Sequence, residues 1–398
     1  MDNNTAKLLG IKDVIIKKVD STETNTQIYL ELPRKIHKCP CCGCETDKIH
    51  DYRRQVVKDI RIGGKPVFLI LKKRRYACPQ CGKRFAEKNY FLPKYHRSTQ
   101  RLILEIINAF RETVSATHIA REHGVSVSTA LRYLDLVNYG KYQLPTVLSI
   151  DEFRGNAGGE KFQTILTDAK NHIILDVLPN RKSSDLTAYF LKFPRKQRLN
   201  VKYVVIDMSS LFFNVAQTCF PNAKIVADKY HVIRQVYWAM ENVRKNMQKN
   251  LSPEWRKFCK RSRYLLNTSP DKLKDDDRQK LRIILGLSTN LEIAYDLKND
   301  FTRLMHTNGS EQGRKLIADW LYHAENTNIK EFGACTRAVH NWSVEILNSL
   351  DCPYTNGFTE GCNNKTKVIK RVSFGVRKFS RFRNRILHCA SHTPNKMR

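Results

Sequence analysis

The chain has 398 residues and carries 70 Lys and Arg against 38 Asp and Glu, a formal net charge of +32. Hydrophobic residues make up 41% of it, which excludes global disorder, and no run of 18 uncharged apolar residues exists, which excludes an ordinary transmembrane helix. The N-terminus lacks the basic start and apolar run of a secretory signal. We therefore expect a cytoplasmic protein of two or three domains, with nucleic acid as the first candidate for a polyanionic partner.

Two matching cysteine turns dominate residues 1–95, which we predict to form a zinc-binding domain that also contacts DNA. Each turn is Cys-x-x-Cys with Pro after the first Cys and Gly after the second. Two such turns supply four thiolates to one tetrahedral ion, which predicts structural Zn²⁺ on Cys39, Cys42, Cys78 and Cys81. Cys41 and Cys44 form an overlapping pair, but the Pro and Gly positions favour Cys39 and Cys42.

A basic hairpin is predicted between the two cysteine turns. Residues 55–62 and 65–74 have strand patterns and are joined by Gly63-Gly64, a hairpin signal. Nine Lys or Arg side chains lie on residues 53–75, and we expect Arg74 and Arg75 among them to contact the DNA backbone.

Residues 96–145 predict a helix-turn-helix domain. Apolar spacing indicates helices over 99–111, 116–122 and 127–137, with a tight turn at Gly124 and a cap at Ser126 before the third helix. The outward residues near the start of that helix are Ser126, Ser128 and Thr129, with Arg132 beyond, and such a helix can enter the major groove. An ordinary three-helix packing unit is the alternative.

Residues 146–232 predict the first part of an α/β core. Strands are expected at 147–150, 162–167, 173–177, 202–206 and 224–227, with helices at 185–193 and 210–219. This is the order of an RNase H-like core, in which three strands are followed by a helix, a strand, a second helix and a last strand. In that topology the first and fourth strands are neighbours, which places Asp151 beside Asp207.

Two neighbouring carboxylates on buried strands repel each other unless a cation bridges them. Oxygen ligands suit Mg²⁺ or Mn²⁺, and a third carboxylate would allow two ions to flank one phosphate. Glu360 is a candidate for that third ligand. Taken singly, Asp207 and Glu360 could instead serve a helix N-terminus, and Asp151 could be a strand-end turn residue.

These segments, taken together and in order, resemble the ISL-three family of bacterial insertion-sequence transposases, a branch of the DDE transposases. The resemblance rests on the double cysteine turn, on Asp151 in IDEF (150–153), on Asp207 in VIDM (205–208), and on Glu360 in NGFTEGCNNK (356–365). It implies that Asp151, Asp207 and Glu360 are the catalytic, metal-binding triad. Asp228 is the main rival to Asp207, and His231 three residues later completes an Asp-x-x-His signature with a DNA-contacting or a structural role.

The resemblance also implies how the rest of the chain is used. Residues 233–354 would be an all-helical insertion, and 355–398 the final part of the core with a basic tail. Four tail residues are candidates for phosphate contact together with Lys365: Arg371, Arg377, Lys378 and Arg381. The expected protein is a multidomain α+β, nucleoid-associated transposase that works as a homodimer or higher assembly on double-stranded DNA.

The expected activity is divalent-metal-dependent strand cleavage and strand transfer at the terminal inverted repeats of the element. The alternative is a catalytically silent, transposase-derived DNA-binding regulator. A third possibility is an RNase H-like nuclease acting on DNA junctions, although such an enzyme would not need two separate N-terminal DNA-reading modules.

Overall fold

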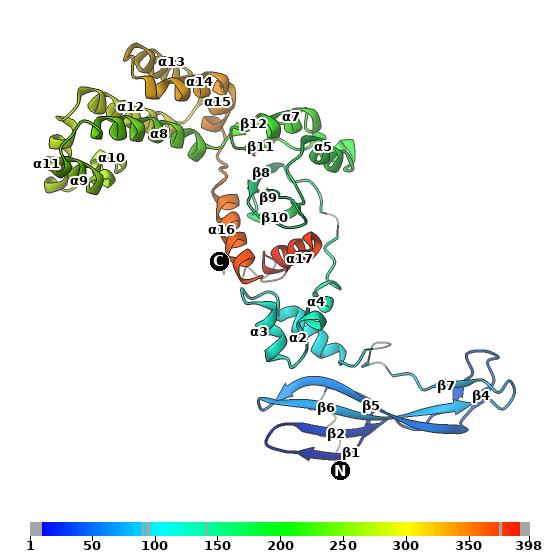
Figure 1. Ribbon diagram of the computed structural model, residues 1–398. Coiled ribbons are helices and arrows are strands. Elements are labelled where there is room, and N and C mark those ends of the chain that lie inside the picture. The colour runs from blue at the N-terminus through cyan, green and yellow to red at the C-terminus, as the bar shows by residue number, and fades with distance from the viewer. Residues whose placement is uncertain (1–9, 90, 93–95, 141, 374–375, 391–398) are drawn as a thin grey trace. The chain divides into compact units, whose positions relative to one another are not determined.

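The computed structural model describes residues 10–89, 91–92, 96–140, 142–373 and 376–390. The chain divides into two compact units (Figure 1). Unit 1 combines the N-terminal 139 residues with the segment that begins at Val368, and unit 2 runs from Gly140 to Lys367. Each unit is described by itself below.

The N-terminal part of unit 1 is a sheet built around one long hairpin. Its strands are β1 (Ile15–Ser21), β2 (Thr26–Glu31), β6 (Lys65–Ala77) and β5 (Ile49–Ile62), in that spatial order, with β7 (Arg84–Ala86) on β6. Gly63 and Gly64 have φ of +58° and +77°, which a tight two-residue hairpin turn requires. The predicted hairpin is thus confirmed, with both strands longer than expected. Strands β1 and β2 were not predicted, and β3 (His37–Lys38) pairs with β4 (Glu45–Thr46).

Three short helices follow, α2 (Gln100–Ala109), α3 (Ala116–Glu122) and α4 (Val127–Leu134). Each begins after a side-chain cap, because Thr99, Ser115 and Ser126 each accept a hydrogen bond from the backbone N–H three residues further on. Their buried faces share one apolar core with Ile106 and Ala130 at its centre. The three helices agree with the prediction, except that α4 ends earlier than expected.

Helix α17 (Phe379–Ala390) packs on this three-helix group within unit 1. Its buried Arg385 donates hydrogen bonds of 2.6 Å to the carbonyls of Phe110, Glu112 and Val114. We expected residues 355–398 to form the final part of the catalytic core, whereas the segment from Val368 onward is grouped with the N-terminal residues in unit 1. The compact unit that contains α17 is the N-terminal one, because α17 satisfies backbone carbonyls of the helical group there.

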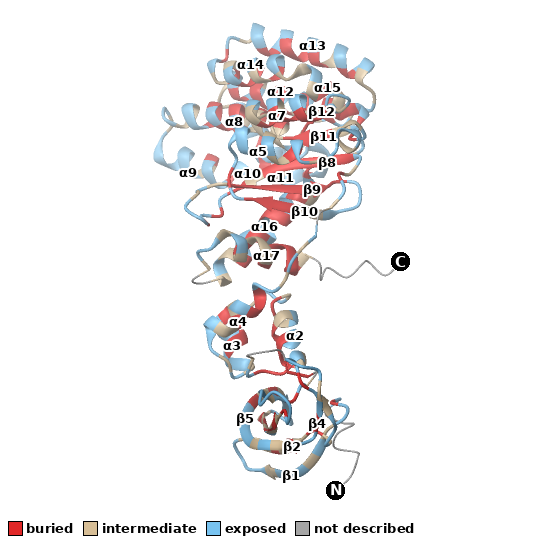
Figure 2. Ribbon diagram, turned by 90° about the vertical axis from the view of Figure 1, so that its right-hand side faces the viewer, coloured by how far each residue is buried: buried red, intermediate tan, exposed pale blue. Residues whose placement is uncertain are grey.

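Unit 2 contains a five-stranded sheet in the order β10-β9-β8-β11-β12. The strands are β8 (Val147–Phe153), β9 (Gln163–Asp168), β10 (Ile173–Leu178), β11 (Tyr203–Ile206) and β12 (Lys224–Ala227). The first three are antiparallel, and β11 runs parallel to both β8 and β12. Helices α5 (Ser183–Leu191), α6 (Arg195–Leu199) and α7 (Ser210–Cys219) connect them, and the strands are largely buried (Figure 2). The predicted adjacency of the first and fourth strands is confirmed.

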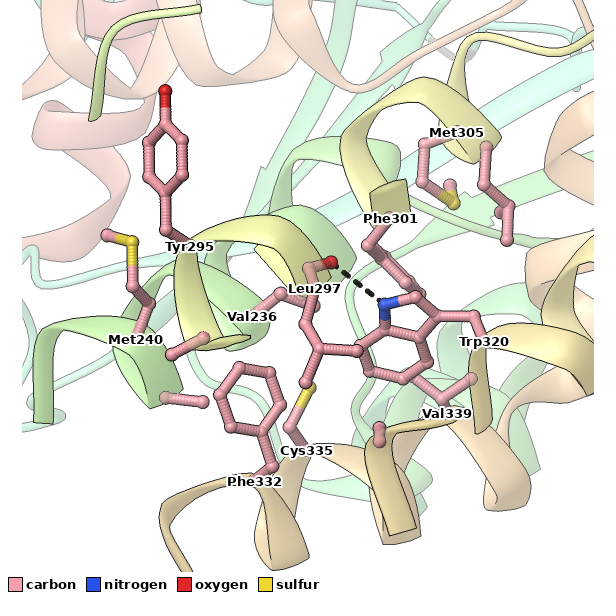
Figure 3. Close-up of a cluster of buried hydrophobic side chains, with 14 of the residues drawn as sticks. Val236, Met240, Tyr295, Leu297, Phe301, Met305, Trp320, Phe332, Cys335 and Val339 are labelled. Atoms are coloured by element: carbon pink, nitrogen blue, oxygen red, sulfur yellow. Dashed lines mark hydrogen bonds between the residues drawn. The ribbon is translucent and has the colours of Figure 1, made fainter. Parts of the chain in front are cut away.

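Residues between β12 and the last helix of unit 2 form helices and connecting turns. The helices are α8 (Lys229–Gln248), α9 (Pro253–Arg261), α10 (Arg263–Asn267), α11 (Asp275–Leu285), α12 (Thr289–Met305), α13 (Ser310–Asn326), α14 (Gly333–Asn341) and α15 (Ser343–Asp351). They share one apolar core in which the Trp320 indole N–H donates a 2.8 Å hydrogen bond to the Leu297 carbonyl (Figure 3). Helix α16 (Gly357–Val372) follows them.

Candidate active site and nucleic-acid interface

The two cysteine turns close on each other as predicted. The Sγ atoms of Cys39 and Cys81 lie 3.6 Å apart, and the Sγ of Cys42 lies 3.5 Å from those of Cys78 and Cys81. All four sulfurs lie within 4.8 Å of one another. A tetrahedron of thiolates at a Zn–S distance of about 2.3 Å has edges of roughly 3.8 Å, so the four side chains fit one Zn²⁺.

The geometry of the turns explains why these four cysteines, rather than Cys41 and Cys44, come together. In each turn the Gly N–H bonds back to the carbonyl of the first Cys, at 3.0 Å for Gly43 and 3.1 Å for Gly82. Both glycines have positive φ, which a β-carbon would strain. Backbone N–H groups of Cys81 and Gln80 lower the pKa of the Cys78 thiol to about 6, which favours the thiolate that a metal needs.

An open groove of ≈ 740 Å³ lies within unit 1, between the β5–β6 hairpin and helix α4. Ser126, Thr129 and Arg132 line it from α4, and the hairpin contributes Lys58. Exposed Ser128 lies in the same first turn of α4. Three of the four residues predicted to contact DNA from this helix therefore line one groove beside a basic strand.

The predicted DNA contacts of the hairpin differ in their surroundings. Arg74 is buried and its guanidinium lies 3.3 Å from the Glu31 carboxylate and 3.4 Å from that of Glu87. This corrects the prediction for Arg74, because both carboxylates already neutralise a side chain that is 7% exposed. Arg75 is ion-paired with Asp51 at 2.9 Å and remains partly exposed.

The basic residues near the C-terminus also differ from one another. Arg381 forms two-pronged hydrogen bonds with the Asp135 carboxylate at the end of α4, and Asp135 raises its pKa. This ion pair links α17 to the end of α4, so Arg381 stabilises unit 1 even when no DNA is bound. The side chains of Lys365, Arg371, Arg377 and Lys378 are exposed.

Three aspartates meet at one edge of the unit 2 sheet, at the carboxyl ends of three adjacent parallel strands. Asp151 lies near the end of β8, and Asp207 and Asp228 directly follow β11 and β12. The register pairs Ser149 with Val205, so Asp151 and Asp207 are level two residues later. It pairs Ile206 with Ala227, so Asp228 is level with both. Neighbouring strands lie about 4.8 Å apart, which explains the mutual electrostatic repulsion of these carboxylates.

Helix α16 covers the same face of the sheet and is joined to it by polar contacts. The Thr359 hydroxyl lies 2.7 Å from that of Thr167 and 3.0 Å from that of Ser149. One turn later, the Asn363 side-chain amide donates a 2.9 Å hydrogen bond to the Asp151 carboxylate. Glu360 precedes Asn363 by three residues, which places it on the same side of the helix, and its side chain is exposed.

Burial and neighbouring negative charges raise the pKa values of Asp151 and Asp207. Burial raises the pKa of Asp151 to about 7, against an opposing hydrogen bond from the Glu152 N–H and with added repulsion from Asp207. Burial also raises the pKa of Asp207, against an opposing contribution from His231. The His231 imidazole lies 2.8 Å from the Asp228 carboxylate, and that hydrogen bond raises the pKa of His231. The site therefore favours a partner that neutralises negative charge.

A divalent cation fits this donor set. One carboxylate oxygen of Asp207 is buried and finds no hydrogen-bond partner in the described part of the chain. An unpaired buried carboxylate oxygen is costly, and a cation would satisfy it. Over the described ranges, however, the four-cysteine group is the only cluster whose ligand atoms lie within 4.8 Å of one another. Asp151, Asp207 and Glu360 do not converge that closely.

Comparison with known proteins gives the family. A family model described as "Transposase", that of the ISL3 branch of the DDE transposases, matches residues 148–386, more than half of the chain. The chain belongs to this family. A second model, described as the zinc-finger of transposase IS204/IS1001/IS1096/IS1165, matches residues 35–81 and supports structural zinc on the four cysteines of this transposase.

Individual transposases are similar along much of the chain. The transposase for insertion sequence element IS1001 from Bordetella parapertussis is 27% identical over 359 residues, which cover 88% of each chain. The transposase for insertion sequence element IS1557 from Mycobacterium tuberculosis (strain H37Rv) is 22% identical over 240 residues, which cover 54% of each chain. No described helix of this transposase is long and apolar enough to cross a membrane.

Sequence reasoning overlooked Asn363, which is buried and contacts Asp151. Its only signal was its position, three residues after Glu360 in the motif NGFTEGCNNK. An amide that orients a carboxylate across 212 positions of sequence separation cannot be recognised from spacing alone. The buried polar residues Thr359, Asn363 and Thr366 on α16, and Asn356 just before the helix, were likewise recognisable only from the folded structure.

Proposed function

We propose that this transposase binds the terminal inverted repeats of its insertion sequence and catalyses metal-dependent strand cleavage followed by strand transfer. The observation that carries the proposal is the level alignment of Asp151 and Asp207 on two adjacent strands, together with a buried Asp207 oxygen that has no hydrogen-bond partner among the described residues. Helix α16 presents Glu360 on the side of its Asp151 contact.

In this proposal Asp151, Asp207 and Glu360 hold Mg²⁺ or Mn²⁺. A divalent ion held by these carboxylates would supply Lewis-acid chemistry, lowering the pKa of an attacking water or 3′-hydroxyl and offsetting charge on the leaving oxygen of the phosphodiester. Asn363 keeps the Asp151 carboxylate aimed into the site, and His231 holds the neighbouring Asp228 carboxylate by a hydrogen bond. Water attacks first and exposes a 3′-hydroxyl, which then attacks target DNA.

Sequence-specific DNA binding is assigned to unit 1. The N-terminal turn of α4 carries Ser126, Ser128 and Thr129, which could reach base edges in the major groove, while Arg132 would contact phosphate. Arg75 on the hairpin and the exposed Lys365, Arg371, Arg377 and Lys378 are proposed to contact phosphate as well. A dimer on paired element ends is the proposed working assembly.

The test uses full-length protein and labelled duplex DNA that carries the element's end. Wild type should nick at the end when Mg²⁺ or Mn²⁺ is added. Asp151→Asn, Asp207→Asn and Glu360→Gln should bind the end with unchanged affinity and fail to nick, whereas Asp319→Asn, an exposed acid on α13, should behave as wild type. If Asp228→Asn abolishes nicking while Asp207→Asn does not, the second catalytic carboxylate is Asp228.

The catalytically silent regulator is the second candidate. It predicts tight binding of the end with no nicking in either metal by the wild-type protein. The orphaned Asp207 oxygen favours the enzyme, because a regulator gains nothing from an uncompensated buried carboxylate.

A further inference from the structure

Helix α8 carries two large aromatic side chains that the fold leaves in solvent. Tyr230 is 51% exposed and Trp238 is 52% exposed, whereas Trp320 in the neighbouring core is 3% exposed. Tyr230, Arg234 and Trp238 follow one another at a spacing of four residues, so they share one face of the helix. We call these three residues the α8 ridge.

The ridge is organised before any ligand arrives. The Arg234 guanidinium carbon lies 5.5 Å from the Tyr230 ring centroid and 4.8 Å from that of Trp238. Cation–π contacts at these distances restrict both rings and the guanidinium between them. The Nε of Arg234 is buried without a hydrogen-bond partner among the described residues.

The ridge begins at the edge of the sheet where the aspartates lie. Helix α8 starts directly after Asp228, and the Tyr230 ring packs edge-on against the His231 ring at 5.6 Å between centroids. His231 is the residue that pairs with Asp228. Eight residues of helix rise about 12 Å, so the ridge leads away from the aspartates over the length of a few nucleotides.

Charge along the same helix suits a polyanion. Beyond Trp238, the exposed side continues with Asn242, Lys245 and Lys249. The single acidic residue of α8, Glu241, is buried and paired with Arg244 at 2.6 Å. The exposed surface of the helix is therefore aromatic near the aspartates and basic farther along.

We propose that the α8 ridge is a stacking platform for an unpaired base of the DNA end next to the scissile phosphate. The proposal rests on the proposed function, because that function brings a DNA end to the aspartates. An aromatic face accepts any base, since every base has a π-face, and Arg234 is placed to contact the adjoining phosphate. Unpairing the terminal base would free the backbone to reach the metal ligands.

The experiment measures binding by the full-length protein without added divalent ions, so that cleavage does not interfere. Two probes carry the element's end, one fully paired and one with the terminal nucleotides unpaired on one strand. Trp238→Ala and Tyr230→Ala should bind the unpaired probe about five- to a hundredfold more weakly than wild type. Their affinity for the paired probe should change much less, and Trp238→Phe should restore most of the lost affinity.

Two controls make the result specific. Trp255→Ala removes an indole that is 42% exposed on α9 and should leave both affinities unchanged. A 5-iododeoxyuridine in the unpaired segment should crosslink under ultraviolet light to Trp238 or Tyr230, as mapped by mass spectrometry.

The proposal is overturned if both alanine variants bind the unpaired probe as wild type does, or if the crosslink maps outside α8. It is also overturned if Trp238→Ala changes the oligomeric state measured by light scattering while DNA binding stays the same, since the ridge would then be a protein interface. Because no divalent ion is present, loss of stacking and loss of nicking are separate results, and either can fail without the other.

Discussion

Replacing Asp151 by Asn should stabilise the metal-free protein while abolishing its proposed activity. Asp151 is an ionisable side chain that is 7% exposed and lies beside two further aspartates. Its folded pKa of about 7 is above the ordinary value of 3.8. The stability contributed by this group is therefore fully present below pH 3.8 and is lost as the pH rises to about 7.

The magnitude follows from the size of the pKa change. Each pKa unit corresponds to about 1.4 kcal/mol, so ionised Asp151 costs on the order of 4 kcal/mol at pH 8 and less than half of that at pH 5. Asn carries no charge, but its amide cannot accept the Asn363 hydrogen bond in the same way, which costs about 1 kcal/mol. We therefore expect the variant to be more stable by roughly 2–3 kcal/mol at pH 8, with a much smaller advantage at pH 5.

The assay is urea unfolding followed by tryptophan fluorescence in buffer without added divalent ions. All four tryptophans, at positions 238, 255, 320 and 342, belong to unit 2, so the signal reports the unit that holds Asp151. Adding Mg²⁺ should stabilise wild type and leave Asp151→Asn unchanged. Glu360→Gln is the control, because its exposed side chain removes no buried charge. An Asp151→Asn variant no more stable than wild type at pH 8 would refute the reasoning.

Three further outcomes are expected. Cys81→Ser should lose the bound zinc measured by mass spectrometry and unfold the cysteine turns, whereas Cys41→Ser should keep one zinc per chain. Arg385→Ala removes the hydrogen-bond donor of three carbonyls and should destabilise the helices of unit 1 by on the order of 3 kcal/mol. Circular dichroism should show an earlier unfolding transition, whereas the unfolding midpoint reported by the tryptophans of unit 2 should not change. Asn363→Ala should raise the Mg²⁺ concentration needed for nicking about tenfold or more, with end binding unchanged, and an unchanged metal requirement would contradict a positioning role.

Local features of the chain predicted local structure well. The Gly63-Gly64 turn, the Ser126 cap and the three parallel strands that carry or precede the aspartates each depend on residues close in sequence. Conformational preference and hydrophobic periodicity operate over that range. The repeated cysteine turn worked for the same reason, because each half of the zinc site is a local motif. Local preferences did not predict β1 and β2 or the full length of the two hairpin strands. These segments become strands through pairing with neighbouring strands in the sheet.

Contacts between distant segments were decided by the tertiary structure. Arg74 and Arg381 looked alike as basic residues in the sequence, but Glu31, Glu87 and Asp135 neutralise them in the folded chain. Helix α17 packs in unit 1 because its Arg385 side chain donates hydrogen bonds to three backbone carbonyls that lie far away in the sequence. Charge balance depends on which side chains meet, and a pattern of charges along the chain does not contain that information.

The sequence by itself determined the strand order, the four zinc ligands and the identity of the carboxylates at the edge of the sheet, because each follows from local patterns and from a topology that leaves few choices. The tertiary structure alone decided that Asn363 reaches Asp151, that one Asp207 oxygen has no hydrogen-bond partner within the described part of the chain, and that Tyr230 and Trp238 are exposed to solvent. The Asn363 contact arises because α16 packs on a strand 212 positions earlier in the sequence. The exposure of Tyr230 and Trp238 arises because the other face of α8 packs into the helical core.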